Sequence, residues 1–111
     1  MIFVIGGAFQ GKTEYVKTHY GLDKKIIQQY HKRIRKQLQE GKDPIKEASV
    51  LLEKELTDNL IIICDEVGSG VVPMKQEERI YREMTGRVSC YFAKEATEVI
   101  RVVAGIGMKI K

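Results

Sequence analysis

The sequence predicts an α/β fold: a three-layer sandwich with a small, mainly parallel sheet of three to four strands plus a candidate edge strand. Two observations support this class. Short runs of aliphatic residues alternate with segments whose apolar residues have helical spacing. Each run is continuously apolar, which is typical of parallel strands with helices on both faces. The length of 111 residues leaves room for one domain, residues 1–111.

The first half of the chain contains one predicted strand and three predicted helices. Met1 to Ile5 is a continuous apolar run that ends in glycine, as expected of a buried strand. The predicted helices run from Lys12 to Tyr20, from Ile27 to Glu40, and from Asp43-Pro44 through Leu56. Apolar spacing predicts the second helix, whereas a capping aspartate followed by a first-turn proline predicts the third.

The second half contains two further predicted strands and one long helix. Leu60 to Cys64 is the second strand, and Val99 to Ala104 is the third. Between them we expect a helix from about Lys75 through Ala96, with a candidate disturbance at Gly86. Met108 to Lys111 is the candidate edge piece.

Directly after the first strand comes the sequence GGAFQGKT, which fits the phosphate-loop pattern G-x-x-x-x-G-K-[ST]. Gly6 and Gly11 permit backbone angles that point N–H groups at phosphate oxygens, and the following helix adds its positive N-terminus. Lys12 can reach the β- and γ-phosphates, and the Thr13 hydroxyl suits Mg²⁺. The nucleotide-binding residues predicted from this loop are Gly6, Gly7, Ala8, Gln10, Gly11, Lys12 and Thr13.

Two acidic residues, Asp65 and Glu66, follow the second strand, where a phosphate-loop enzyme needs a carboxylate near its metal ion. Successive strand residues point to opposite faces, so we expect one of the pair to face the nucleotide. Asp65 is the candidate for the Mg²⁺ shell. Glu66 is either a group that acts on substrate or a capping group.

The distribution of charge narrows the classes of partner. The chain has 19 Lys and Arg against 15 Asp and Glu, a net charge of +4. Between Lys24 and Lys42, seven basic residues and one acidic residue give +6. This segment is either a solvated helix face or a cationic wall that helps to hold phosphates. Aromatic positions for stacking on bases are few, so we expect no nucleic-acid partner.

The apolar segments are too short for a membrane span. No run approaches the roughly 20 residues that a spanning helix requires, and the N-terminus lacks the charged start of a signal peptide. Cys64 lies in an apolar run and Cys90 on a predicted helix, which does not indicate a disulfide framework. We expect a cytoplasmic protein.

Residues 65–73, DEVGSGVVP, resemble the N-E-V-G-x-G-[IV]-V-P segment of the adenosylcobinamide kinase/adenosylcobinamide-phosphate guanylyltransferase family. The likeness continues in residues 79–88, similar to that family's R-x-F-R-D-x-x-G-R-x-N-Q, and in residues 95–111, similar to its A-D-E-V…V-V-A-G-I-x-x-x-[LI]-K ending. GGAFQGKT is similar to its G-G-A-R-S-G-K-S start. The resemblance covers about residues 1–20 and 60–111.

The resemblance implies a fold similar to phosphate-loop (P-loop) NTPases and two activities of cobalamin biosynthesis. One phosphorylates adenosylcobinamide with a nucleoside triphosphate, and the other transfers GMP from GTP to the resulting phosphate through a guanylylated histidine. It further implies GTP or ATP and Mg²⁺ as cofactors, adenosylcobinamide as substrate, and a homo-oligomer. Arg82 and Arg87 are expected to contact the nucleotide or substrate, or else to be surface charge.

His31 is the candidate for the guanylylated histidine. Residues 30–36 are loosely similar to the family's R-I-x-x-H-x-x-R helix, and their basic side chains could lower the pKa of His31 and bind phosphate. Otherwise His31 is a solvated helix residue. The residues predicted to be catalytic are Lys12, His31, Asp65 and Glu66, and those predicted to bind metal are Thr13 and Asp65.

The middle of the chain departs from the family pattern. A further acidic strand of the family is not recognisable between Gly21 and Asn59. Asp65 replaces the family's Asn, which suggests that it took over the metal role of that strand. These departures leave an alternative open: a GTP- or ATP-binding regulatory or partner module that has lost cobinamide chemistry.

Overall fold

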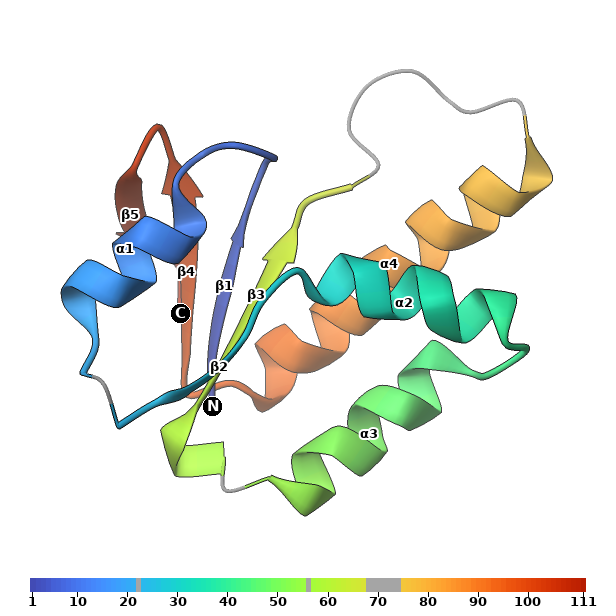
Figure 1. The fold of residues 1–111 in the computed structure, drawn as a ribbon, viewed down its shortest axis with the longest axis horizontal. Helices are drawn as coiled ribbons and strands as arrows, with labels where there is room; N and C mark the ends of the chain where they lie inside the picture. The colour runs from blue at the N-terminus through green and yellow to red at the C-terminus, as the bar shows by residue number, and fades with distance from the viewer. Residues whose placement is uncertain (22, 56, 68–74) are drawn as a thin grey trace.

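The computed structural model describes residues 1–21, 23–55, 57–67 and 75–111. The described residues contain five strands, four α-helices and one 3-10 turn (Figure 1). The strands are β1 (Ile2–Gly6), β2 (Lys25–Ile27), β3 (Leu60–Asp65), β4 (Glu98–Val103) and β5 (Ile106–Lys109). The helices are α1 (Lys12–His19), α2 (Tyr30–Gln39), α3 (Pro44–Lys54) and α4 (Gln76–Glu95), and the turn is Thr57–Asn59.

One sheet contains all of these strands, in the order β2-β3-β1-β4-β5. The pairs β1–β3, β1–β4 and β2–β3 are parallel, whereas β5 runs antiparallel to β4 at the edge. The tight turn into β5 has positive φ at Ala104 (51°) and Gly105 (77°), as a two-residue hairpin turn requires. The predicted class, a mainly parallel sheet with an edge strand, is confirmed.

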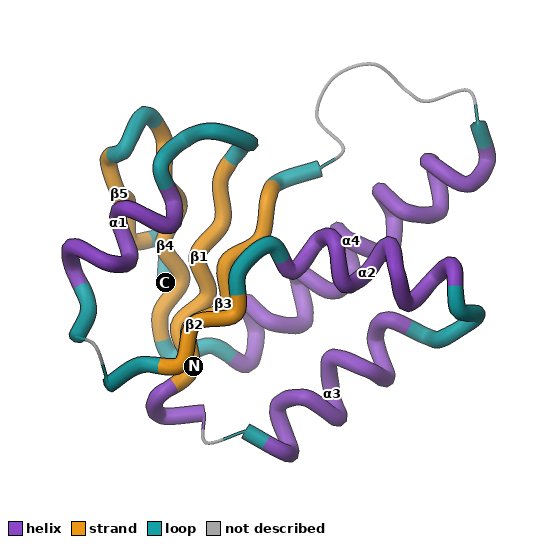
Figure 2. The backbone as a smooth tube through the Cα atoms, viewed as in Figure 1, coloured by secondary structure: helices purple, strands orange, loops and turns teal. Residues whose placement is uncertain are grey.

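Helices cover both faces of the sheet (Figure 2). Alternate residues of β1 show the division, because Phe3 packs in the core shared with α2, α3 and α4, whereas Val4 packs with Val16 of α1. The larger core is centred on Phe92, which contacts Phe3 and Tyr30 with ring centroids 5.5 and 4.9 Å apart. The fold is therefore the three-layer arrangement expected from the sequence.

Strand β2 was not predicted, and the expectation of a helix that begins at Ile27 was wrong. Residues 25–27 pair with Leu60–Ile62 of β3, and Ile27 is buried in the larger core. Gln29 then has a positive φ of 52° and lies directly before α2, which begins at Tyr30. A three-residue strand carries too short a pattern to be distinguished from the first turn of a helix.

Helix α4 is continuous from Gln76 to Glu95, so the expected disturbance at Gly86 is absent. A Cβ atom built on Gly86 has no neighbour within 4 Å, which places this glycine on the open side of the helix. Glycine in a helix interior costs about 1 kcal/mol relative to alanine, which the packing of Val88 and Phe92 outweighs. Within the described residues, no helix is both long and apolar enough to cross a membrane.

The start of α3 yields a testable expectation. The Asp43 carboxylate accepts a hydrogen bond from the Ile45 N–H at 3.0 Å and caps the helix, as the sequence predicts. Replacing Asp43 by alanine should lower the free energy of unfolding by about 1 kcal/mol, measured by urea denaturation. Asp43→Asn keeps an accepting oxygen and should lose less than half of this. Equal losses in the two variants would contradict the capping role.

Candidate active site

The loop between β1 and α1 is held closely against the β4–β5 hairpin. A Cβ atom on Gly6 would lie 2.5 Å from the Val102 carbonyl oxygen, so only glycine fits at this position. Gly11 has a φ of 85° and lies against Gly105. The side chain of Gln10 accepts a hydrogen bond from the Ala104 N–H at 2.7 Å, and its carbonyl accepts one from the Gly105 N–H at 2.8 Å. Gln10, predicted to bind nucleotide, thus also holds the loop in place.

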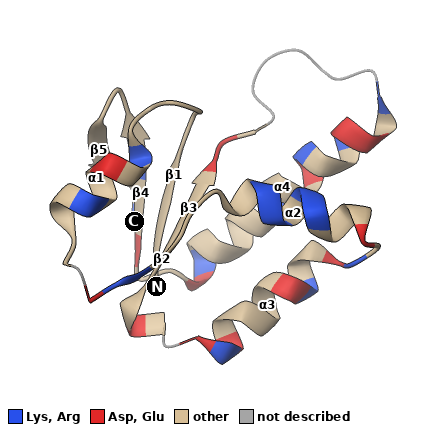
Figure 3. Ribbon diagram, in the orientation of Figure 1, with Lys and Arg blue, Asp and Glu red and all other residues tan. Residues whose placement is uncertain are grey.

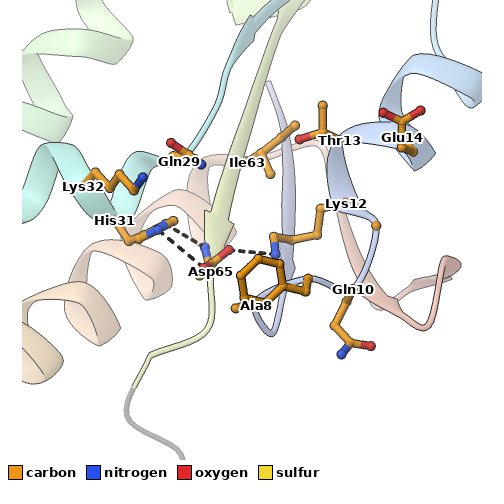
Figure 4. A pocket seen from close by; sticks show the side chains of 12 residues that line it. Ala8, Gln10, Lys12, Thr13, Glu14, Gln29, His31, Lys32, Ile63 and Asp65 are labelled. Carbon is orange, nitrogen blue, oxygen red and sulfur yellow. Dashed lines mark hydrogen bonds and ion pairs between the residues drawn. The ribbon is translucent and has the colours of Figure 1, made fainter.

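Lys12 occupies the centre of the loop and is buried, with 7% of its surface exposed. Its ammonium donates to the Gly7 carbonyl at 2.6 Å and lies 2.7 Å from Oδ1 of Asp65 at the end of β3 (Figure 4). A buried ammonium needs partners of this kind, because burial without them costs several kcal/mol. The ion pair between Lys12 and Asp65 therefore joins the loop that follows β1 to the end of β3.

His31, in the first turn of α2, lies against the other oxygen of the same carboxylate. Its Nδ1 accepts the backbone N–H of Asp65 at 3.1 Å, and its Nε2 is 3.4 Å from Oδ2 of Asp65 (Figure 4). In the neutral ring the proton is then on Nε2 and faces the carboxylate. Burial lowers the pKa of His31, Asp65 opposes this, and Lys12, Lys32 and Arg35 add to the lowering.

These three side chains line one cavity of about 370 Å³. Its described lining is Ala8, Phe9, Gln10, Gly11, Lys12, Thr13, Glu14, Gln29, His31, Lys32, Ile63 and Asp65. Gln29, Glu14 and Lys32 were not singled out as site residues. Of these three, only Lys32 belongs to a pattern noted in the sequence, the basic segment, and it is the one Lys or Arg of that segment in the described lining. Figure 3 shows the positions of Lys and Arg along α2 in blue.

Oxygen ligands for a magnesium ion are present in this cavity. The Thr13 hydroxyl and the Asp65 carboxylate both line it, and Mg²⁺ is bound by one or two such oxygens together with phosphates and waters. Thr13 Oγ1 lies 3.5 Å from Oε1 of Gln28, and Asp65 is paired with Lys12. Among the described residues there is no cluster of three or more His, Cys, Asp or Glu side chains. The donor set thus suits a nucleotide-bound Mg²⁺.

Glu66 lies on the other side of the strand end. Its two carboxylate oxygens accept hydrogen bonds from Nε and Nη2 of Arg101 at 2.9 and 3.1 Å, and it does not line the cavity. Alternation along β3 accounts for this, as the sequence predicted that one of the two acids would face the nucleotide. Glu66 therefore links the end of β3 to Arg101 of β4 and does not contact this cavity.

Arg82 and Arg87, expected near the nucleotide, are on α4 and do not line the cavity. Arg87 pairs with Glu83 one helical turn earlier at 3.0 Å, and both side chains are more than half exposed. A nucleotide contact of these two arginines therefore stays a prediction from the family resemblance. Helix α4, which carries both, packs against α2 and α3 on the sheet face opposite α1.

Two other side chains with reactive groups do not line the cavity. Cys64 is buried in the larger core, and burial raises the pKa of its thiol to about 12, so it is not a nucleophile. His19 lies in the last turn of α1, where Nδ1 is 2.9 Å from the Tyr15 carbonyl oxygen. Its ring stacks on Tyr15 with the centroids 4.0 Å apart, outside the cavity.

Comparison with known proteins places the chain in a family. Residues 22–110 match the family model described as cobinamide kinase / cobinamide phosphate guanyltransferase. The bifunctional adenosylcobalamin biosynthesis proteins CobU of Escherichia coli K12 and of Salmonella typhimurium LT2 are each 44% identical to it over 52 residues. The aligned stretch covers 47% of this chain but only 29% of each relative. Because the family model matches most of the chain, the protein belongs to the cobinamide kinase / cobinamide phosphate guanyltransferase family.

Proposed function

We propose that this protein is a nucleotide-dependent transferase of cobalamin biosynthesis, which phosphorylates adenosylcobinamide, transfers GMP from GTP to adenosylcobinamide phosphate, or does both. GTP or ATP and Mg²⁺ are the proposed cofactors. The observation that carries the proposal is the meeting of Lys12, Asp65 and His31 on one cavity beside the phosphate loop. Family membership supplies the chemical context.

For phosphoryl transfer, the main tasks of the protein are positioning and charge neutralisation. The terminal phosphates would bind to the N–H groups of the loop and to Lys12, which must then turn from Asp65 toward the phosphate oxygens. The acceptor hydroxyl attacks the γ-phosphorus and passes its proton to an oxygen of the transferred phosphate. The bond from that phosphorus to the β–γ bridging oxygen breaks, and the nucleoside diphosphate leaves. Lys12 and Lys32 would bear the charge that develops on the phosphate oxygens.

For GMP transfer, His31 would be the nucleophile. Attack through Nε2 requires the neutral ring to carry its proton on Nδ1, so Nδ1 must first release the Asp65 N–H. Nε2 then attacks the α-phosphorus of GTP, and pyrophosphate leaves. The phosphate of the acceptor attacks the same phosphorus, and the bond to Nε2 breaks, which leaves the ring neutral again. The lowered pKa of His31 supports this role, because a neutral imidazole is the nucleophilic form.

A labelling experiment tests this role of His31. Incubation with GTP labelled at the α-phosphate and Mg²⁺ should leave an acid-labile, base-stable label on the protein, as a phosphoramidate does. The chain has two histidines, which provides a matched control. His31→Ala should remove the label, whereas His19→Ala should keep it. Label that survives in His31→Ala would contradict the assignment.

Asp65 is expected to strengthen nucleotide binding only in the presence of metal. Asp65→Ala should reduce the Mg²⁺-dependent gain in nucleotide affinity by about tenfold, measured by titration calorimetry with and without Mg²⁺. The affinity without Mg²⁺ should not fall, because the substitution also removes a negative charge beside Lys12. Glu66→Ala, outside the cavity, should leave both affinities unchanged. An unchanged Mg²⁺-dependent gain in Asp65→Ala would refute the metal role.

The short alignment with the CobU proteins favours an alternative function for this chain. The chain aligns with less than a third of the length of each CobU protein. A GTP- or ATP-binding module that regulates or accompanies another protein of the same pathway would need the phosphate loop but not the transfer step. Such a module would bind nucleotide tightly, show no label on His31 and form no corrinoid product.

A further inference from the structure

A second cavity of about 370 Å³ lies between α2 and α4, and the proposed phosphate chemistry does not use it. Its described lining is Arg35, Leu38, Gln39, Glu77, Ile80 and Tyr81. This volume is within the range of about 300–1,000 Å³ that is typical of small-molecule sites. The apolar lining includes Ile80, which is 41% exposed and is therefore available to a ligand.

Helix α2 forms a wall of both cavities. His31 and Lys32 line the first, whereas Arg35 and Leu38 line the second. His31, Arg35 and Leu38 follow the spacing i, i+4, i+7, which places them on one face of the helix. Since the rise is 1.5 Å per residue, His31 and Leu38 are separated by roughly 10 Å along the axis. One face of α2 thus runs from the phosphate site to the second cavity.

The wall of the second cavity is fixed by contacts within the chain. The Arg35 guanidinium lies 3.8 Å from the centre of the Tyr81 ring. It also donates to both oxygens of Glu78, at 2.7 and 3.2 Å. This two-point contact compensates the charge of Arg35 and limits its motion, so that Arg35 serves as a wall beside the apolar side chains. Gln39 and Glu77 provide polar groups on the lining.

We infer that this second cavity binds one edge of the acceptor's macrocycle, which is the apolar part of the acceptor. The arm that carries the reacting group then extends along α2 to His31. The inference rests on the proposed function. A macrocycle cannot share a cavity of about 370 Å³ with a bound nucleotide, so the acceptor body needs a separate place. The amide and carboxylate of Gln39 and Glu77 suit the amide side chains of a corrinoid.

A substitution that fills the second cavity tests the inference. Ile80→Trp should raise the acceptor concentration for half-saturation at least about tenfold, in whichever transfer the wild type catalyses. The nucleotide affinity and the rate of any His31 labelling should stay within about twofold of wild type, because the nucleotide does not reach this cavity. Ile110→Trp is the matched control: Ile110 is 59% exposed and lines neither cavity, so the acceptor dependence should not change.

The outcomes separate the inference from the proposed function. A wild-type protein that transfers neither phosphate nor GMP to a corrinoid would overturn both. Transfer by the wild type with unchanged acceptor dependence in Ile80→Trp would overturn the inference alone. A lower molecular mass for Ile80→Trp than for the wild type in sedimentation would also overturn the inference, because it would show that this cavity takes part in self-association. If the indole prevents folding, Ile80→Ala should still raise the half-saturating concentration about threefold through loss of apolar contact.

Discussion

Replacing Lys12 by alanine is expected to lower nucleotide-dependent transfer at least 100-fold, about the loss seen when a charge-stabilising group is removed from an active site. The ammonium of Lys12 is the buried cation of the cavity, held between the Gly7 carbonyl and Asp65. Without it, the β- and γ-phosphates would lose the one buried ammonium that separates them from the Asp65 carboxylate among the described residues. Nucleotide affinity, measured by titration calorimetry, should fall with the rate.

Two variants control for folding and for general charge. Lys17→Ala removes an exposed cation from the last turn of the same helix and should leave the transfer rate unchanged. Lys12→Arg keeps the charge but should not restore activity, because the larger guanidinium does not fit the space between Gly7 and Asp65. Full activity in Lys12→Ala would contradict the role of the phosphate loop.

Gly6→Ala is expected to lower the free energy of unfolding by about 2–3 kcal/mol, as overpacking in a well-packed site does. The added Cβ would lie 2.5 Å from the Val102 carbonyl oxygen and 3.3 Å from Cδ of Lys12. The first atom belongs to the backbone of β4 and cannot move without displacing that strand. The loop would therefore shift away from Val102, and nucleotide affinity should also fall.

Gly7→Ala is the matched control for this loss. A Cβ on Gly7 meets only Cγ of Gln10 at 3.6 Å, which is ordinary van der Waals contact. We expect its free energy of unfolding to remain within about 0.5 kcal/mol of wild type. Urea denaturation of both variants measures the difference. Equal stability of Gly6→Ala and Gly7→Ala would show that β4 does not limit the position of the loop.

Features that depend on short stretches of sequence were predictable. The buried strands β1, β3 and β4 and the cap at Asp43 each follow from local residue chemistry, and the structure contains all of them. The glycine-rich loop between β1 and α1 also lies where the local sequence pattern predicts it. Alternation along a strand also predicts that the side chains of Asp65 and Glu66 point in opposite directions. Asp65 points toward the cavity and Glu66 toward Arg101. In these cases the nearest neighbours along the chain determine the result.

Features that depend on packing between distant segments were not predictable. Strand β2 forms because residues 25–27 meet β3, which lies more than thirty residues later in the sequence. The family resemblance indicated Arg82 and Arg87, but the path of α4 across the sheet decides that they do not reach the cavity. Likewise, the basic segment did not reveal that His31 would contact Asp65, because that contact requires α2 to begin beside the end of β3.

The most direct test of the account is a product assay with adenosylcobinamide or its phosphate, Mg²⁺ and either GTP or ATP, which resolves the phosphorylated product from the guanylylated one. The account predicts at least one of these products from the wild-type protein and none from Lys12→Ala. Absence of both products from a folded wild-type protein that binds nucleotide would contradict it, as would undiminished product formation by Lys12→Ala.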